Sequence, residues 1–220
     1  MKKLLYICFI VSIFVACGKI ETYTIPEVIQ GNSKYMITRY IEANDIKYIF
    51  YDIFDDELLT LKIEFIGENI SFGPKFDEYA AKYGDTHFNS PVLMNRYACV
   101  TNDFIAISAK SDSDFNEIPA GYPLDNIIRI MTTSPYRFIA SNYSTQATIW
   151  PTEMQNICDK LDTFPVYGYL SQLGWEDLLL LDDIAYLKFT EIPEIKNHNI
   201  TLSFYMESGK LEKTIPVTFE

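Results

Sequence analysis

The stretch LTLKIEFIG, residues 59–67, alternates apolar and polar side chains without interruption from Leu59 to Phe65. A period of two puts Leu61 and Ile63 on one side of an extended chain, as in a β-strand with one buried face. A sheet built from such strands must pack that face against a second layer. The stretch therefore predicts a layered β fold.

Extended segments follow one another along most of the chain from residue 34 onward. They are rich in β-branched and aromatic residues and are separated by turn-forming residues. Two pairs are predicted to form hairpins, 96–111 with its turn at 101–103 and 199–220 with its turn at 207–210. The other predicted strands are YMITRYI (35–41), IKYIFYDIF (46–54) and the two halves of NIIRIMTTSPYRFIAS (126–141), which break at Ser134-Pro135.

Helical signals are fewer. The segment 75–84 ends in Gly84, which suits a C-terminal cap, and a second helix is predicted to begin at Thr152. The segment 175–183 fits either a short helix or a buried strand. The apolar face of the first helix consists of residues at helical spacing: Phe76, Tyr79, Ala80 and Tyr83.

Together these segments predict about eight to ten short strands separated by turns. The predicted fold class is mainly β: an antiparallel β-sandwich, immunoglobulin-like or related, with two or three short helices. Residues 34–220 are expected to form a single β-sandwich domain, and a sub-division near 145–165 is left open.

The first 16 residues have the parts of a secretory signal peptide. Met1-Lys2-Lys3 is basic, residues 4–15 carry no charge and Ala16 is small. The apolar run is shorter than the ~20 residues of a spanning helix. Residues 14–17, FVAC, resemble the bacterial lipobox, in which a diacylglyceryl group is attached to the cysteine and the chain is cut just before it.

Cys17 is therefore predicted to be the first residue of a lipoprotein and to carry palmitate-type acyl chains. Residues 1–16 are the predicted signal peptide, and residues 17–33 are the predicted tether to an outer membrane. Three acyl chains anchor a protein firmly, since each buried methylene contributes roughly 0.8 kcal/mol. The alternative is an ordinary secretory signal in which Cys17 is incidental.

The composition favours a folded acidic protein. Apolar residues make up 48% of the chain, which argues against disorder. Loss of Lys2 and Lys3 with the signal peptide changes the formal net charge from -12 to -14. Nucleic-acid binding relies on clusters of Lys and Arg that this chain does not have, so no nucleic-acid partner is expected.

The chain has 4 cysteines, of which Cys8 leaves with the signal peptide and Cys17 carries the lipid. Cys99 and Cys158 remain and are candidates for a disulfide, because disulfides form outside the cytoplasm. The alternative is two separate buried thiols that behave as small apolar residues.

Motifs for nucleophilic catalysis and for nucleotide cofactors are absent from the sequence. No Ser lies in a G-x-S-x-G setting, no S-x-x-K pair occurs, and the 9 glycines form no phosphate-binding pattern. His87 and His198 are predicted to lie in solvated loops, because their neighbours are polar. We therefore predict no catalytic residue and no cofactor.

Two groups of acidic residues are weaker candidates. The stretch SDSDFNE offers oxygen ligands for a hard cation such as calcium at Asp112, Asp114, Asn116 and Glu117, although a solvated turn is the alternative. A glycosidase needs two facing carboxylates. The candidates for such a pair are Asp55, Asp56, Glu57, Glu176, Asp177, Asp182 and Asp183.

Aromatic residues in or near turns of the second half could stack on sugar rings or bind a protein partner. The alternative is that these side chains fill the core of the sandwich. The candidates for ligand stacking are Tyr122, Trp150, Tyr167 and Trp175.

Two stretches, SDSDFNEIPAGYPLDNIIRI (111–130) and NITLSFYMESGKLEKTIPVTFE (199–220), together with the lipobox, resemble uncharacterised lipoproteins of Bacteroidetes-type bacteria. The resemblance implies a largely β fold of unknown function and an outer-membrane address in a Gram-negative cell envelope. It transfers no functional residues. Only Glu21 is acidic among residues 18–21, which leaves the orientation, periplasmic or surface-facing, open.

The expected function is therefore a non-enzymatic binding or interaction module on the envelope, with a glycan, a peptide or an envelope protein as its partner. A carboxylate-based hydrolase such as a glycosidase is one alternative. A structural component of a surface assembly is the other.

Overall fold

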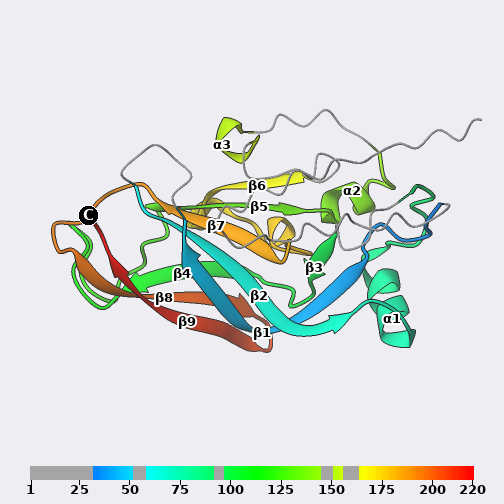
Figure 1. Ribbon diagram of the computed structural model, residues 1–220, viewed down its shortest axis with the longest axis horizontal. Helices are drawn as coiled ribbons and strands as arrows, with labels where there is room; N and C mark the ends of the chain where they lie inside the picture. Colours follow the sequence, from blue (N-terminus) through cyan, green and yellow to red (C-terminus); the bar gives the residue numbers. More distant parts are fainter. Residues whose placement is uncertain (1–31, 52–57, 92–96, 145–150, 156–163) are drawn as a thin grey trace, which may run out of the picture.

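The computed structural model describes residues 32–51, 58–91, 97–144, 151–155 and 164–220 (Figure 1). Within them lie nine strands: β1 (Arg39–Phe50), β2 (Thr60–Ile70), β3 (Ala98–Val100), β4 (Ala106–Ser111), β5 (Ile128–Ser134), β6 (Phe164–Tyr169), β7 (Ile184–Phe189), β8 (Asn197–Met206) and β9 (Gly209–Thr218). The helices are α1 (Pro74–Tyr83), α2 (Tyr136–Ala140) and α3 (Thr152–Gln155), with the 3-10 turns η1 (Leu170–Gln172) and η2 (Trp175–Asp177).

The described strands form two sheets. One has six strands in the order β3-β1-β2-β7-β5-β6, and the other has three strands in the order β4-β8-β9. β3 runs parallel to β1, and the other strand pairs are antiparallel. The prediction of a mainly β fold with two sheets and short helices is confirmed.

The main core lies between the two sheets. Phe65 on β2 and Phe204 on β8 meet with ring centroids 5.1 Å apart, and Phe104 packs against both. The predicted alternation of β2 is confirmed, since Leu61 and Ile63 are fully buried on the same face as Phe65. Apolar burial on facing sheets is the main stabilisation of a sandwich.

A second apolar cluster lies at the end of the molecule where β1 begins. Figure 1 shows α1 and α2 together at this end, beside β3. Phe76 and Ala80 of α1, Tyr40 of β1 and Phe138 of α2 are buried in one cluster. The predicted helix is confirmed, and Gly84 ends it in the left-handed conformation with φ 79°.

A β-bulge at Asn44 allows β1 to bury side chains in the main core both before and after the bulge. The register shifts between Ala43 and Asp45. Ile41 before the bulge and Ile46 after it are therefore both buried in the main core, although five positions separate them. Opposite the bulge only glycine fits, because a Cβ on Gly67 would lie 1.8 Å from the carbonyl oxygen of Glu42.

The predicted hairpin at 96–111 is wrong. β3 pairs with β1 in the large sheet, whereas β4 pairs with β8 in the small one. The intervening residues thus carry the chain from one sheet to the other. Residues 101–103 contain a bend at Asn102 rather than a hairpin turn, and both strands find their partners far away in the sequence.

Two further predictions need correction. β5 ends at Ser134 as expected, but the second half of 126–141 forms α2, because Phe138 and Ile139 both face the second cluster. Of the two alternatives for 175–183, the buried strand is wrong. The short helix holds for Trp175–Asp177 as the 3-10 turn η2, after which the chain turns through Leu180, which has φ 51°.

The helix predicted from Thr152 begins there as α3, and the rest of that prediction lies outside the described residues. The closing hairpin is confirmed, with Met206 opposite Gly209.

Candidate functional site

A groove of about 500 Å³ opens at the end of the sandwich that carries the helices. Such a volume is within the ~300–1,000 Å³ of ordinary ligand sites. Segments far apart in the sequence meet here: the end of α1, the crossover 102–105, the start of α2, η2 and the turn between β8 and β9. Its lining residues are Lys82, Tyr83, Asn102, Asp103, Phe104, Ile105, Tyr136, Trp175, Leu179, Met206, Glu207 and Ser208.

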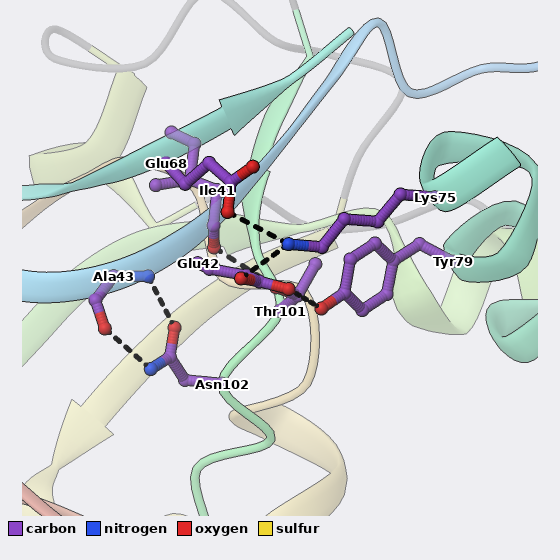
Figure 2. A network of polar contacts seen from close by, with 8 residues as sticks. All are labelled: Ile41, Glu42, Ala43, Glu68, Lys75, Tyr79, Thr101 and Asn102. Atoms are coloured by element: carbon purple, nitrogen blue, oxygen red, sulfur yellow. Dashed lines mark hydrogen bonds and ion pairs between the residues drawn. The ribbon is translucent and has the colours of Figure 1, made fainter. Parts of the chain in front are cut away.

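Asn102 attaches the crossover to the bulge of β1 (Figure 2). Its amide oxygen accepts a hydrogen bond from the Ala43 N–H, and its amide nitrogen donates one to the Ala43 carbonyl, both at 2.8 Å. Thr101 adds a hydrogen bond from its backbone N–H to the carbonyl of Ile41, at 3.0 Å. The side chain of Asn102 thus takes the place of a strand partner, which holds this wall of the groove in position.

The same network fixes α1 beside the crossover. Figure 2 shows Lys75 between Glu42 and Glu68, with Nζ–O distances of 2.8 and 2.9 Å, and Tyr79 donating a hydrogen bond to Glu42. The hydrogen bonds from Lys75 and Tyr79 lower the pKa of Glu42 below its usual range. The carboxylate of Glu42 therefore stays ionised and links the helix to β1.

At the polar end of the groove, Asp103, Tyr83 and Lys82 contact one another. Asp103 accepts a 2.7 Å hydrogen bond from the hydroxyl of Tyr83 on one oxygen and pairs with Lys82 on the other. The Lys82 ammonium also lies 4.8 Å from the centre of the Tyr83 ring. Burial, followed by the bond to Asp103, raises the pKa of Tyr83, so the phenol remains a donor.

Trp175 also lines the groove and is 55% exposed. Its 3-10 turn is held by Asp177, which accepts a 3.0 Å hydrogen bond from the N–H of Gly174 and pairs with Arg137 of α2. Leu178, directly after the turn, is buried. The indole therefore faces the groove from a backbone that is fixed on both sides.

Of the four aromatic candidates, the structure places Trp175 in the groove. Tyr122 is 62% exposed but lies outside the groove lining. Tyr167 on β6 is half-buried and accepts a 3.2 Å hydrogen bond from Arg129, which also lies over its ring. Trp150 lies outside the described residues.

Three of the four candidate ligands in the stretch 111–117 accept hydrogen bonds within the fold. Asp112 accepts hydrogen bonds from the backbone and the side chain of Asn199 at 2.8 and 2.7 Å. Asp114 accepts one from the Ala120 N–H, and Asn116 one from the Glu194 N–H.

Glu117 lies in the same loop, where Phe115 and Ile118 form an isolated bridge. In the part of the chain that the structure describes, no three His, Cys, Asp or Glu side chains are grouped to hold a metal ion.

Of the carboxylates considered for a glycosidase pair, the described residues include Glu176, Asp177, Asp182 and Asp183. Glu176 is exposed beside Trp175, and Asp182 is buried. Asp183 pairs with Arg39 at 2.7 Å, and Asp177 pairs with Arg137. Asp55, Asp56 and Glu57 lie outside the described residues.

Cys99 is buried in β3, whereas Cys17 and Cys158 lie outside the described residues, so the disulfide stays a prediction. Among the helices that the structure describes, none combines the length and the apolar composition needed to cross a bilayer.

The prediction that His198 lies in a solvated loop is wrong, because His198 is buried in β8. Its Nε2 donates a hydrogen bond to the carbonyl of Ile195 and its Nδ1 contacts the hydroxyl of Ser111, both at 2.7 Å. His87 is exposed, as expected.

Sequence reasoning missed most of the other groove residues. Ile105 and Met206 were read only as strand residues, and Asp103 only as part of a turn. A usable signal was the polar pair Asn102-Asp103 directly before Phe104 and Ile105, because it places hydrogen-bonding groups beside the exposed side chain of Ile105.

Comparison of the chain with protein-family models, with curated proteins and with solved structures finds no match.

Proposed function

We propose that this protein is a cell-envelope lipoprotein whose β domain is a non-enzymatic binding module, and that its ligand occupies the groove beside Trp175. The observation that carries the proposal is an exposed indole on a backbone that Asp177 and Leu178 hold in place. Tryptophan combines a large apolar contact area with few rotatable bonds, and it is enriched where proteins bind their partners.

One reason to favour binding over hydrolysis is the state of Asp103, one of the two carboxylates that line the groove. Both oxygens of Asp103 are engaged, one by Tyr83 and the other by Lys82. A general acid needs a free approach to the substrate, and these two contacts work against it. Asp103 is therefore better suited to holding the wall of the groove than to proton transfer.

The proposed location is the outer membrane of a Gram-negative cell, with acyl chains on Cys17 as the anchor. The support is the leader of residues 1–16 and the lipobox-like FVAC at its end. A binding module tethered in this way keeps its ligand near the membrane at a high local concentration.

The groove is tested by comparing two exposed aromatic residues. Full-length wild type, Trp175→Ala and the control Tyr122→Ala are applied to a printed oligosaccharide array and to a peptide array. We expect Trp175→Ala to lose about tenfold or more of the signal, because truncation of a central aromatic contact commonly costs 2 kcal/mol or more. Tyr122→Ala should keep it. Silence on both arrays, or equal losses in the two variants, contradicts the proposal.

The anchor is tested by labelling cells with radioactive or alkyne-tagged palmitate. Wild type should incorporate the label and Cys17→Ala should not, because the thioether needs the thiol. A label that persists in Cys17→Ala would mean that the lipid is attached elsewhere.

A further inference from the structure

Resting on the proposed function, we infer that the groove takes a polypeptide segment that carries an apolar side chain next to a lysine or arginine. A neutral oligosaccharide is the competing ligand for an exposed tryptophan. The choice between the two depends on which hydrogen bonds, which apolar contacts and which charge the groove offers.

Hydrogen bonding at the crossover wall of the groove disfavours a sugar. Asn102 uses its amide oxygen and nitrogen on Ala43, and Asp103 uses both oxygens on Tyr83 and Lys82. A sugar brings several hydroxyl groups into the site, and each one that loses water without gaining a partner weakens binding. An apolar side chain makes no such demand.

Apolar contacts favour a hydrophobic side chain. Ile105 is 46% exposed and Trp175 is 55% exposed, and both line the same groove. Phe104, Leu179 and Met206 complete the apolar part of the lining. Methionine adapts its shape to different partners, and a patch of this composition with a polar rim is typical of peptide and protein recognition.

The charge of the groove favours a ligand in which a lysine or arginine lies next to the apolar side chain. Lys82 is paired with Asp103, so the remaining charge among the lining residues is the carboxylate of Glu207. Glu207 is exposed in the turn between β8 and β9, and the described part of the chain provides no ion pair for it. With a chain of formal net charge -12 around it, this rim attracts a cation and repels an acidic ligand.

The experiment measures binding to full-length protein in lipid nanodiscs by isothermal titration calorimetry. The heat measured with empty nanodiscs is subtracted. The probes are a blocked tetrapeptide KLFK, its acidic counterpart ELFE, and cellotetraose. We expect KLFK to bind about tenfold or more tightly than ELFE and cellotetraose. The variant Glu207→Gln should weaken KLFK by roughly two- to fivefold, as expected for a rim charge, and raised salt should have the same effect. Trp175→Ala should abolish KLFK binding, and Tyr122→Ala should leave it unchanged.

The outcomes separate the two proposals. Tighter binding of cellotetraose than of KLFK overturns the peptide inference and leaves the binding groove intact. Equal affinities for KLFK and ELFE, or no effect of Glu207→Gln and salt, also overturn the inference. Failure of all three probes to bind, together with silent arrays, overturns the inference and the proposed function together.

Discussion

Asp85 is a carboxylate with no exposed surface, and it joins three parts of the chain. It accepts hydrogen bonds from the N–H groups of Met36 and Ile37 and from the hydroxyl of Tyr143, each at 2.8 Å. Burial raises the pKa of Asp85 above its usual range, although these bonds oppose the effect. The residue thus ties the segment before β1 to the end of α1.

We predict that Asp85→Asn destabilises the protein by about 1–3 kcal/mol, because one oxygen that accepts N–H groups becomes a nitrogen that cannot. The measurement is urea unfolding of the full-length protein at neutral pH. The matched control is Asp112→Asn, since Asp112 accepts similar bonds at the surface. A loss in Asp85→Asn no larger than in the control would show that the buried bonds contribute little.

His198 shows what a closer reading of single residues could have found. In β8 it lies on the same face as Ile200, Leu202 and Phe204, two, four and six positions further on, and all four are buried. Its polar neighbours suggested solvent, but the period of two pointed inward. The carbonyl of Ile195 can only accept, so Nε2 carries the proton in the neutral ring.

At the scale of elements, the bulge in β1 positions the crossover and through it the groove. The close approach of the Glu42 carbonyl requires glycine at position 67. Helix α1, by contrast, was predictable from its own spacing and its glycine cap, because those signals lie within ten residues. The crossover was not predictable from the sequence, because a turn signal does not indicate whether the next strand returns to the same sheet.

Gly67→Ala is expected to destabilise the protein by about 1–3 kcal/mol, because the new methyl group collides with backbone that cannot move independently. The control is Gly174→Ala, where φ is -86° and the nearest atom to the added Cβ is 3.6 Å away. That change should be neutral or stabilising by up to about 1 kcal/mol. Thermal unfolding of both variants measures the difference, and similar melting temperatures would argue against the tight approach.

The contact between α1 and β1 is predicted to depend on pH through Glu42. Because folding lowers the pKa of Glu42, the stabilisation is present above the unfolded value of 4.5 and is lost as the pH falls through the folded value. Both partners are partly exposed, so we expect only about 0.2–1 kcal/mol between wild type and Glu42→Gln at pH 7.

The difference between wild type and Glu42→Gln should shrink as the pH is lowered below 4.5, as measured by urea unfolding. Glu68→Gln is the control, because Glu68 binds the same Lys75 with a side chain that is 62% exposed. A constant difference between wild type and Glu42→Gln across the pH range would exclude the carboxylate as its source.

At the scale of the whole molecule, the main core connects the two sheets from β1 to β9. Phe204 is fully buried between them, in contact with Phe65 and Phe104. The expectation that residues 34–220 form one domain stays a prediction, and this core provides its test. A shared core implies that both sheets unfold together.

Phe204→Ala is therefore expected to cost about 3–5 kcal/mol, with far-ultraviolet circular dichroism and tryptophan fluorescence reporting the same transition. Phe72→Ala is the control, because Phe72 is 86% exposed and should change stability by less than about 0.5 kcal/mol. Two separate transitions would instead support a sub-division of the chain.

Local patterns in the chain were enough to predict a two-layered β fold, helix α1 and the closing hairpin, because alternation, helical spacing and turn residues act over a few positions. They also singled out Trp175, though without a reason to prefer it over Tyr122. The tertiary structure decided that the strands around residues 101–103 belong to different sheets, that Asn102 replaces a strand partner, and that Trp175 and Ile105 line the same groove. These features depend on pairing between residues tens of positions apart, and no local pattern records which distant segments will meet.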